Sequence, residues 1–118
     1  MQNDVNKMEL FHEYYQQWIE VYKRGAIREA TMAKYLMTQK WVKKLAPELK
    51  VSELTRTAYQ KLLNDYAKEH ERQTTLDFHH QLKGSILDAV DEGLIERDPT
   101  RKAISKGKSP RVKKIKYL

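Results

Sequence analysis

Four histidines are the side chains of this sequence whose chemistry first suggests a metal or acid–base site, but their spacing does not form one. His12 and Glu13 begin a pattern typical of zinc-binding helices, yet Gln16 stands where the second histidine would be needed. His79 and His80 are adjacent, about 100° apart around a helix, and cannot both face one ion. We therefore expect no metal site and interpret this pair as surface or groove-facing residues.

The other chemistry-bearing residue types also fail to form a catalytic arrangement. Asp88, Asp91 and Glu92 fit the solvated polar face of a helix better than an acid–base pair. The four glycines are scattered at positions 25, 84, 93 and 107, so the sequence has no glycine-rich phosphate loop. We predict no catalytic residue and no cofactor.

Basic residues, in contrast, are concentrated at the C-terminal end. The first 100 residues carry 15 basic and 16 acidic side chains, so the net charge of +7 comes from the tail. A basic tail on a neutral body is typical of polyanion-binding proteins, and nucleic acid fits better than anionic lipid because the tail has no bulky apolar anchor before its last residues. Residues 101–118 contain eight basic side chains and no acidic one: Arg101, Lys102, Lys106, Lys108, Arg111, Lys113, Lys114 and Lys116.

Length and composition limit the class of protein. The 118 residues fit one domain, and the lack of cysteine fits an intracellular protein. No apolar run approaches the roughly 20 residues of a membrane span, and residues 1–7 lack the apolar core of a signal peptide. We expect a soluble, cytoplasmic protein with no membrane partner.

Apolar residues at helical spacing predict four helices, of which the first has an aromatic stripe. The first runs over about residues 4–24, capped by Asp4 and ended by Gly25. The second runs from Glu29 or Thr31 to Leu45 and is stopped by the following Ala-Pro. We interpret the aromatic stripe of the first helix as core rather than as a base-stacking platform, since such platforms usually lie on sheets.

The third and fourth helices are predicted to follow caps at Thr55 and Thr74 and to end near His70 and Glu92. A connector over residues 49–54 joins the second helix to the third and tucks its apolar side chains into the core. Gly93 ends the fourth helix, and the Asp-Pro pair at 98–99 forbids further helix. The expected fold is a compact all-α bundle of four to five helices over residues 1–100, with a flexible basic tail over residues 101–118.

A polycationic tail binds DNA without reading it, whereas sequence reading needs a helix face in the major groove. Cations and short hydroxyls are combined at the starts of the second and fourth helices. Each candidate also has a plain structural interpretation, since Thr31 and Thr74 fit caps, and Lys34 and Lys83 fit solvated lysines. The predicted DNA-binding residues are Arg28, Thr31, Lys34, Thr38, Thr74, Thr75, His79 and Lys83 on the helices, and Lys106, Lys108, Arg111, Lys113 and Lys114 in the tail.

Four stretches of the sequence resemble the core-binding domain of phage-type integrases of the tyrosine recombinase family. They are the aromatic segment 11–18, T-x-x-x-Y over 31–35, V-x-E-L-T over 51–55 and A-V-D-E-G-L-I-x-x-D-P-T over 89–100. The last is the most specific, with Asp98 where asparagine is commoner in the family. Both residues favour the same turn.

The resemblance implies a SAM-like helical module that precedes a catalytic domain and clamps double-stranded DNA together with it. In that family the second and fourth helices face the major groove, which favours Thr31, Lys34, Thr74 and Thr75 as contacts. The tail then corresponds to the interdomain linker, and further partners are the catalytic domain of the same parent chain and other recombinase protomers on DNA. The family's catalytic residues belong to that other domain, so we expect no strand cleavage by this chain and do not equate Tyr117 with the nucleophile.

Two other classes of function stay open. One is a helical protein-interaction module whose basic tail is a nonspecific arm. The other, a stand-alone enzyme, has the least support because no catalytic arrangement is found.

Overall fold

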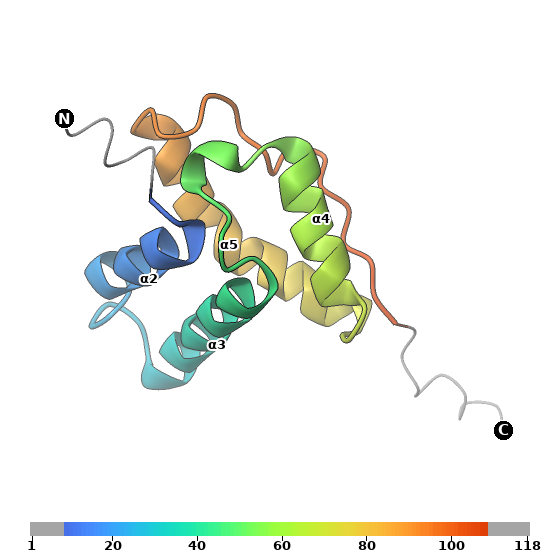
Figure 1. Ribbon diagram of the computed structural model, residues 1–118. Helices are drawn as coiled ribbons and strands as arrows, with labels where there is room; N and C mark the ends of the chain where they lie inside the picture. The colour runs from blue at the N-terminus through green and yellow to red at the C-terminus, as the bar shows by residue number, and fades with distance from the viewer. Residues whose placement is uncertain (1–8, 109–118) are drawn as a thin grey trace, which may run out of the picture.

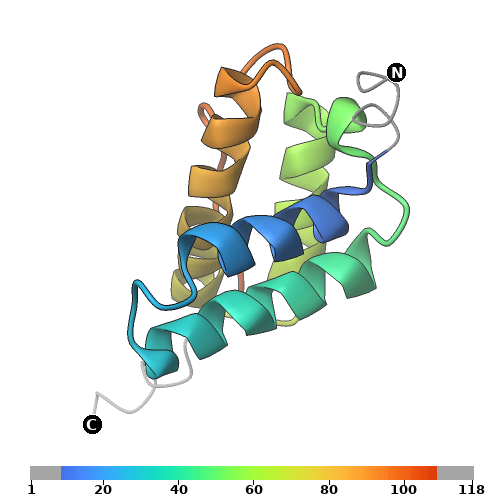
Figure 2. The ribbon, with the colours of Figure 1, turned by 90° about the vertical axis from the view of Figure 1, so that its left-hand side faces the viewer.

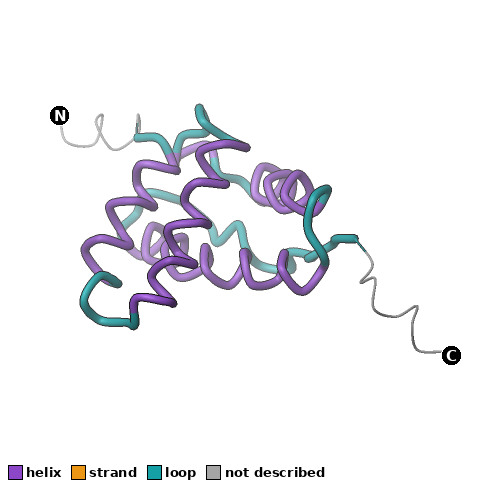
Figure 3. Tube along the Cα trace, turned by 90° about the horizontal axis from the view of Figure 1, so that it is seen from below, coloured by secondary structure: helices purple, strands orange, loops and turns teal. Residues whose placement is uncertain are grey.

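The computed structural model describes residues 9–108, and in that range it contains four α-helices, one short 3₁₀ helix and no strand (Figure 3). The expectation of an all-α fold is therefore confirmed. The elements are α2 (Phe11–Tyr22), α3 (Glu29–Leu45), η1 (Val51–Glu53), α4 (Arg56–Ala67) and α5 (Arg72–Asp91). The predicted cap Asp4 and the predicted DNA contacts Arg111, Lys113 and Lys114 lie outside the described residues.

The helices form two layers. Helices α2 and α3 lie side by side, and α4 and α5 run across behind them (Figures 1 and 2). The core between the layers combines aliphatic and aromatic side chains, and Phe11, Tyr15, Tyr59 and Phe78 are at most 1% exposed. The aromatic stripe of α2 is thus core, as expected, except for Tyr22, which is 55% exposed.

Within the described residues, α2 begins at Phe11 and residues 9 and 10 are not helical, so the prediction of one continuous helix over residues 4–24 is wrong. Leu10 forms an isolated bridge with Lys50, and the Phe11 amide donates to the Leu49 carbonyl at 2.8 Å. The Val51 amide donates to the Glu9 carbonyl at 2.9 Å. These long-range bonds hold the chain extended just before α2, and local sequence signals do not reveal them.

Helix α5, the fourth of the predicted helices, begins at Arg72. Thr74 therefore lies within its first turn and is not its cap. Glu71 takes the cap position with extended backbone and forms an isolated bridge with Lys108. Thr31 is likewise inside α3, which has Arg28 at its cap position. Helix α4 ends at Ala67, three residues before the predicted end at His70.

Other boundaries agree with the sequence. Helix α3 spans Glu29–Leu45, and the Thr55 hydroxyl accepts from the Ala58 amide at 3.1 Å. Gly93 follows α5 with φ of +81°, the left-handed conformation expected of a helix-ending glycine. The connector over residues 49–54 does place Val51 and Leu54 in the core, where they are 1% and 2% exposed.

The turn at Asp98 fixes the direction in which the chain leaves α5. One carboxylate oxygen of Asp98 accepts from the Thr100 amide at 2.8 Å and from the Thr100 hydroxyl at 2.5 Å. Thr100 is 2% exposed. The aspartate therefore makes the expected turn and anchors the next residues to the core.

The first part of the predicted flexible tail is not free. We call residues 99–108 the exit segment; it runs along the side of α4 that faces away from α2 and α3 (Figure 1). The Gln60 side chain donates to the Ile104 carbonyl at 2.8 Å and accepts from the Ile104 amide at 3.0 Å. The Lys108 amide donates to the His70 carbonyl at 2.9 Å. The prediction of a flexible tail that begins at residue 101 is therefore wrong for residues 101–108.

Gly107 lets the exit segment approach α5. Its φ is +157°, and a Cβ built on it would lie 2.3 Å from the Arg72 amide nitrogen.

We predict that Gly107→Ala separates the exit segment from α5, so that hydrogen exchange of the Ile104 and Lys108 amides becomes much faster. Gly25→Ala is the matched control, since Gly25 has φ of +87° with nothing within 4 Å of its Cβ position. It should lower stability by roughly 1 kcal/mol without changing exchange at those two amides. Unchanged exchange in Gly107→Ala would contradict the docking of the segment.

Candidate nucleic-acid interface

The starts of α3 and α5 border one groove of about 480 Å³, which we call the α3–α5 groove. It brings together side chains from two helices that the sequence analysis treated as separate candidates. Four of the predicted DNA-binding residues line it, namely Thr31, Lys34, Thr38 and Thr74, beside Tyr35, Met37, Tyr66, Asp77, Phe78, His80 and Gln81.

The floor of the α3–α5 groove is tied together by hydrogen bonds and ring stacking. The Thr38 hydroxyl donates to the Gln81 side-chain oxygen, which links α3 to α5. Tyr66 and Phe78 stack with ring centroids 3.8 Å apart and planes 3° from parallel, which links α4 to α5. The groove therefore has a fixed shape set by three helices.

The rim of the α3–α5 groove carries side chains that can reach a ligand. Thr31, Lys34, Met37, Thr74, Asp77 and His80 are all exposed. They supply an ammonium donor, two hydroxyls, an imidazole, a carboxylate acceptor and a flexible apolar side chain. Base edges in a major groove offer donors, acceptors and the thymine methyl group, so this set is chemically complementary to them.

Three of the predicted DNA-binding residues are buried, so their side chains are not available for the predicted contacts. Thr38 is 4% exposed on the groove floor, and Thr75 is 0% exposed, with its hydroxyl donating to the Glu71 carbonyl at 3.2 Å. His79 is 8% exposed and faces α4, where its Nδ1 lies 2.8 Å from the Tyr59 hydroxyl. Each already has a partner inside the bundle.

The Tyr59–His79 pair is neutral because of its burial. Burial raises the pKa of Tyr59, with the Asp98 carboxylate adding to the effect. Burial lowers the pKa of His79, and the neighbouring His80 and Lys83 lower it further. A neutral phenol and a neutral imidazole in contact serve packing and orientation rather than DNA contact.

Met37 and Asp77 border the groove and were not among the predicted contacts, and His80, which also borders it, was interpreted only as a surface or groove-facing residue. A full helical stripe through α5 would have found Asp77 and His80, whereas Met37 lies on α3. Buried positions follow the spacing i, i+3, i+4, i+7 from Thr75 through Phe78 and His79 to Leu82, which leaves His80 on the other side. This periodicity, and not residue type, distinguishes the buried His79 from the exposed His80.

The remaining predicted contacts lie around the groove or beyond it. Arg28 is exposed at the cap position of α3 but does not line the groove, and Lys83 is half-buried further along α5. Lys106 and Lys108 are exposed on the exit segment. Because the backbone of Lys108 forms a β-bridge with that of Glu71, the exit segment reaches the start of α5, close to Thr74.

Neither a metal-ligand cluster nor a membrane-spanning helix is found in the part of the chain that the structure describes. No three His, Asp or Glu side chains between residues 9 and 108 are grouped so as to hold a metal ion. No helix in the same range is long and apolar enough to span a bilayer.

Comparison with known proteins gives a specific result. No protein-family model and no curated protein matches the sequence. The crystal structure of the N-terminal domain of the prophage pi2 integrase from Lactococcus lactis is similar to this chain, with 36% identity and a TM-score of 0.79, over 84% of this chain and 94% of that one. The solution NMR structure of a phage integrase fragment from Staphylococcus saprophyticus is similar with 32% identity and a TM-score of 0.71, over 81% of this chain and 87% of that one.

The lowered pKa of His79 predicts a pH-dependent stability. The unfolded chain binds a proton on this residue at higher pH than the folded chain does, so the free energy of unfolding falls as pH drops below the unfolded value of about 6.5. It continues to fall until the pH passes the lowered folded value. His79→Gln should flatten this part of the stability curve measured by urea unfolding, and His80→Gln, at the exposed neighbour, should leave it steep. Equal curves for wild type and His79→Gln would show that His79 is not buried as a neutral group.

Proposed function

This chain belongs to the N-terminal domains of phage integrases, and from that premise we propose that it is the DNA-binding, core-binding module of a site-specific tyrosine recombinase. In this role it grips one side of a recombination site while the catalytic domain of the parent protein grips the other. The proposed reaction of the parent protein is integration or excision of a phage or another mobile element. The module itself contributes binding and positioning, and no strand cleavage.

The observation that carries this proposal is the α3–α5 groove. The first halves of α3 and α5 present Lys34, Thr74 and His80 along one exposed rim over a floor that is fixed by packing. A major groove is about 12 Å wide and admits a helix, so side chains at helix starts can reach its base edges. Because the floor is held by packing, the two helices that carry these side chains need not rearrange on binding, which favours specific contact.

The exit segment supports the proposed role of the tail. It leaves the bundle at the start of α5, beside the α3–α5 groove, and its residues 101–108 include four basic side chains and no acidic one. A chain that leaves at this point can follow the phosphate backbone of a duplex that lies against the rim of the α3–α5 groove. We propose that residues 1–100 form the module and that residues 101–118 lead along DNA to the catalytic domain, with other protomers assembling on the same site.

We predict that, at low salt, the chain retains duplexes that share a short preferred sequence from a pool of randomised duplexes. Because half of a clamp lacks the avidity of the whole, its dissociation constant should be on the order of micromolar. Lys34→Ala combined with His80→Ala should remove the preference, since a good base contact contributes about 1–3 kcal/mol of discrimination. The measurement is sequencing of the retained duplexes.

Lys43→Ala is the control, because Lys43 is exposed on α3 but does not line the groove. It should keep the preference of the wild-type chain. An unchanged preference in the Lys34→Ala and His80→Ala double variant would contradict the groove as the reading surface. Failure of the wild-type chain to retain any duplex would contradict the proposed function.

A further inference from the structure

A second groove, of about 740 Å³, lies between α4 and the exit segment, and we call it the α4–exit groove. Its lining includes five basic side chains and no acidic one. Two come from α4 and three from the exit segment: Arg56, Lys61, Arg101, Lys102 and Lys106. Such a one-sided charge across two separate segments creates a field that attracts an anion.

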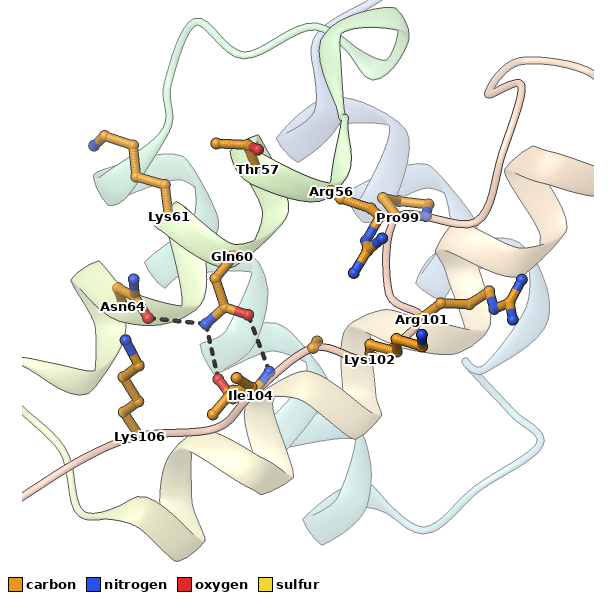
Figure 4. Close-up of a pocket in the computed structure, with 11 residues that line it drawn as sticks. Arg56, Thr57, Gln60, Lys61, Asn64, Pro99, Arg101, Lys102, Ile104 and Lys106 are labelled. Atoms are coloured by element: carbon orange, nitrogen blue, oxygen red, sulfur yellow. Dashed lines mark hydrogen bonds between the residues drawn. The ribbon is translucent and has the colours of Figure 1, made fainter.

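Four of these cations have no carboxylate partner among residues 9–108. The ion pair of Lys61 is with Asp65, at 3.0 Å on α4, and Figure 4 shows its side chain directed away from the exit segment. Arg56, Arg101, Lys102 and Lys106 take part in no ion pair within that range and are exposed. Their charge is therefore available to a ligand.

Gln60 holds the two walls of the α4–exit groove at a fixed separation. Its amide bonds both backbone groups of Ile104, as a neighbouring strand would, and also donates to the Asn64 side chain at 2.9 Å (Figure 4). Figure 4 shows Arg56, Arg101 and Lys102 toward one end of the groove and Lys106 beside Asn64 at the other. The cations thus lie along the groove rather than at one point.

The backbone at Lys102 is the least expected feature of this groove. The Ala103 amide donates to the Thr100 carbonyl at 3.2 Å, which closes a turn, and Lys102, the third residue of the turn, has φ of +59°. Glycine is the usual residue at a turn position with positive φ, and within residues 9–108 Lys102 is the only other residue type with positive φ. A lysine at a position that strains the backbone points to a use for its side chain.

We propose that the α4–exit groove is a second DNA contact surface, which binds the phosphodiester backbone and is separate from the α3–α5 groove. This inference rests on the proposed function, because both grooves would act on the same duplex. Arginine forks and lysine ammonium groups bind phosphate oxygens and carry no base information, so this surface adds affinity and orientation rather than sequence preference.

The test measures binding of the complete 118-residue chain to a short fluorescein-labelled duplex of mixed sequence over a series of salt concentrations. Arg56→Gln combined with Arg101→Gln should lower the slope of log affinity against log salt by about 2, with a roughly tenfold loss of affinity at the lowest salt. Lys40→Gln combined with Lys43→Gln is the matched control, since it removes the same charge from exposed α3 positions outside both grooves. The control should keep the slope of the wild-type chain.

Lys102→Gly separates DNA contact from a structural role. Glycine relieves the positive φ, so this variant should unfold at the same temperature as the wild-type chain or higher, yet bind the duplex with a slope lower by about 1. A variant that unfolds earlier and binds DNA as the wild-type chain does would overturn the use proposed for this side chain.

The outcomes distinguish this inference from the proposed function. The two double variants could show equal slopes of log affinity against log salt while the sequence preference still depends on Lys34 and His80. That result would contradict the α4–exit groove as a DNA contact and leave the proposed function standing. A wild-type chain that does not bind the duplex even at low salt would remove both proposals.

Discussion

The burial of one face of α5 is the constraint on which the rest of the structure depends. From Thr75 to Ala89 this helix buries a continuous stripe, and every other α-helix contacts it there. On the α2 side, the Trp18 indole donates to Asp88 at 2.7 Å and the Tyr14 hydroxyl donates to the Ser85 carbonyl at 3.2 Å. Thr38 connects α3 to the same helix, and Tyr59 and Tyr66 connect α4 to it. The relative positions of the helices are therefore set along a single element.

This constraint also explains where ligands can bind. The stripe begins at Thr75, so the first turn of α5 is left exposed beside the start of α3, and the α3–α5 groove forms there. The end of the exit segment packs against the same turn. The backbones of Glu71 and Lys108 form a β-bridge there, and Gly107 approaches the backbone closely. In the proposed function, base contacts and phosphate contacts are divided between two surfaces that share α5 as their support. In that proposal a groove with only one lysine binds DNA weakly alone, and the four cations of the α4–exit groove that have no ion pair within residues 9–108 add the electrostatic attraction.

Much of the fold could be predicted from the sequence because its signals are local. The apolar spacing of α4, the Thr55 cap and the Asp98 turn each depend on residues a few positions apart. The errors at Thr38, Thr75 and His79 arose because polar residue types were assigned to the surface, although their positions continue the buried stripes. The starts of α2 and α5 and the docking of the exit segment depend on contacts such as Gln60 with Ile104, 44 residues apart, for which the sequence has no local pattern.

The central claim is that the starts of α3 and α5 act together as one DNA-binding surface. Amide NMR titration of the chain with a short duplex tests it most directly, at low salt and again at moderate salt. The account predicts shifts for residues 28–38, 72–83 and 99–108 that persist in the first two ranges at moderate salt, with α2 unaffected. Shifts confined to residues 101–118 and lost on adding salt would contradict it, because the chain would then be a helical bundle with a nonspecific basic arm.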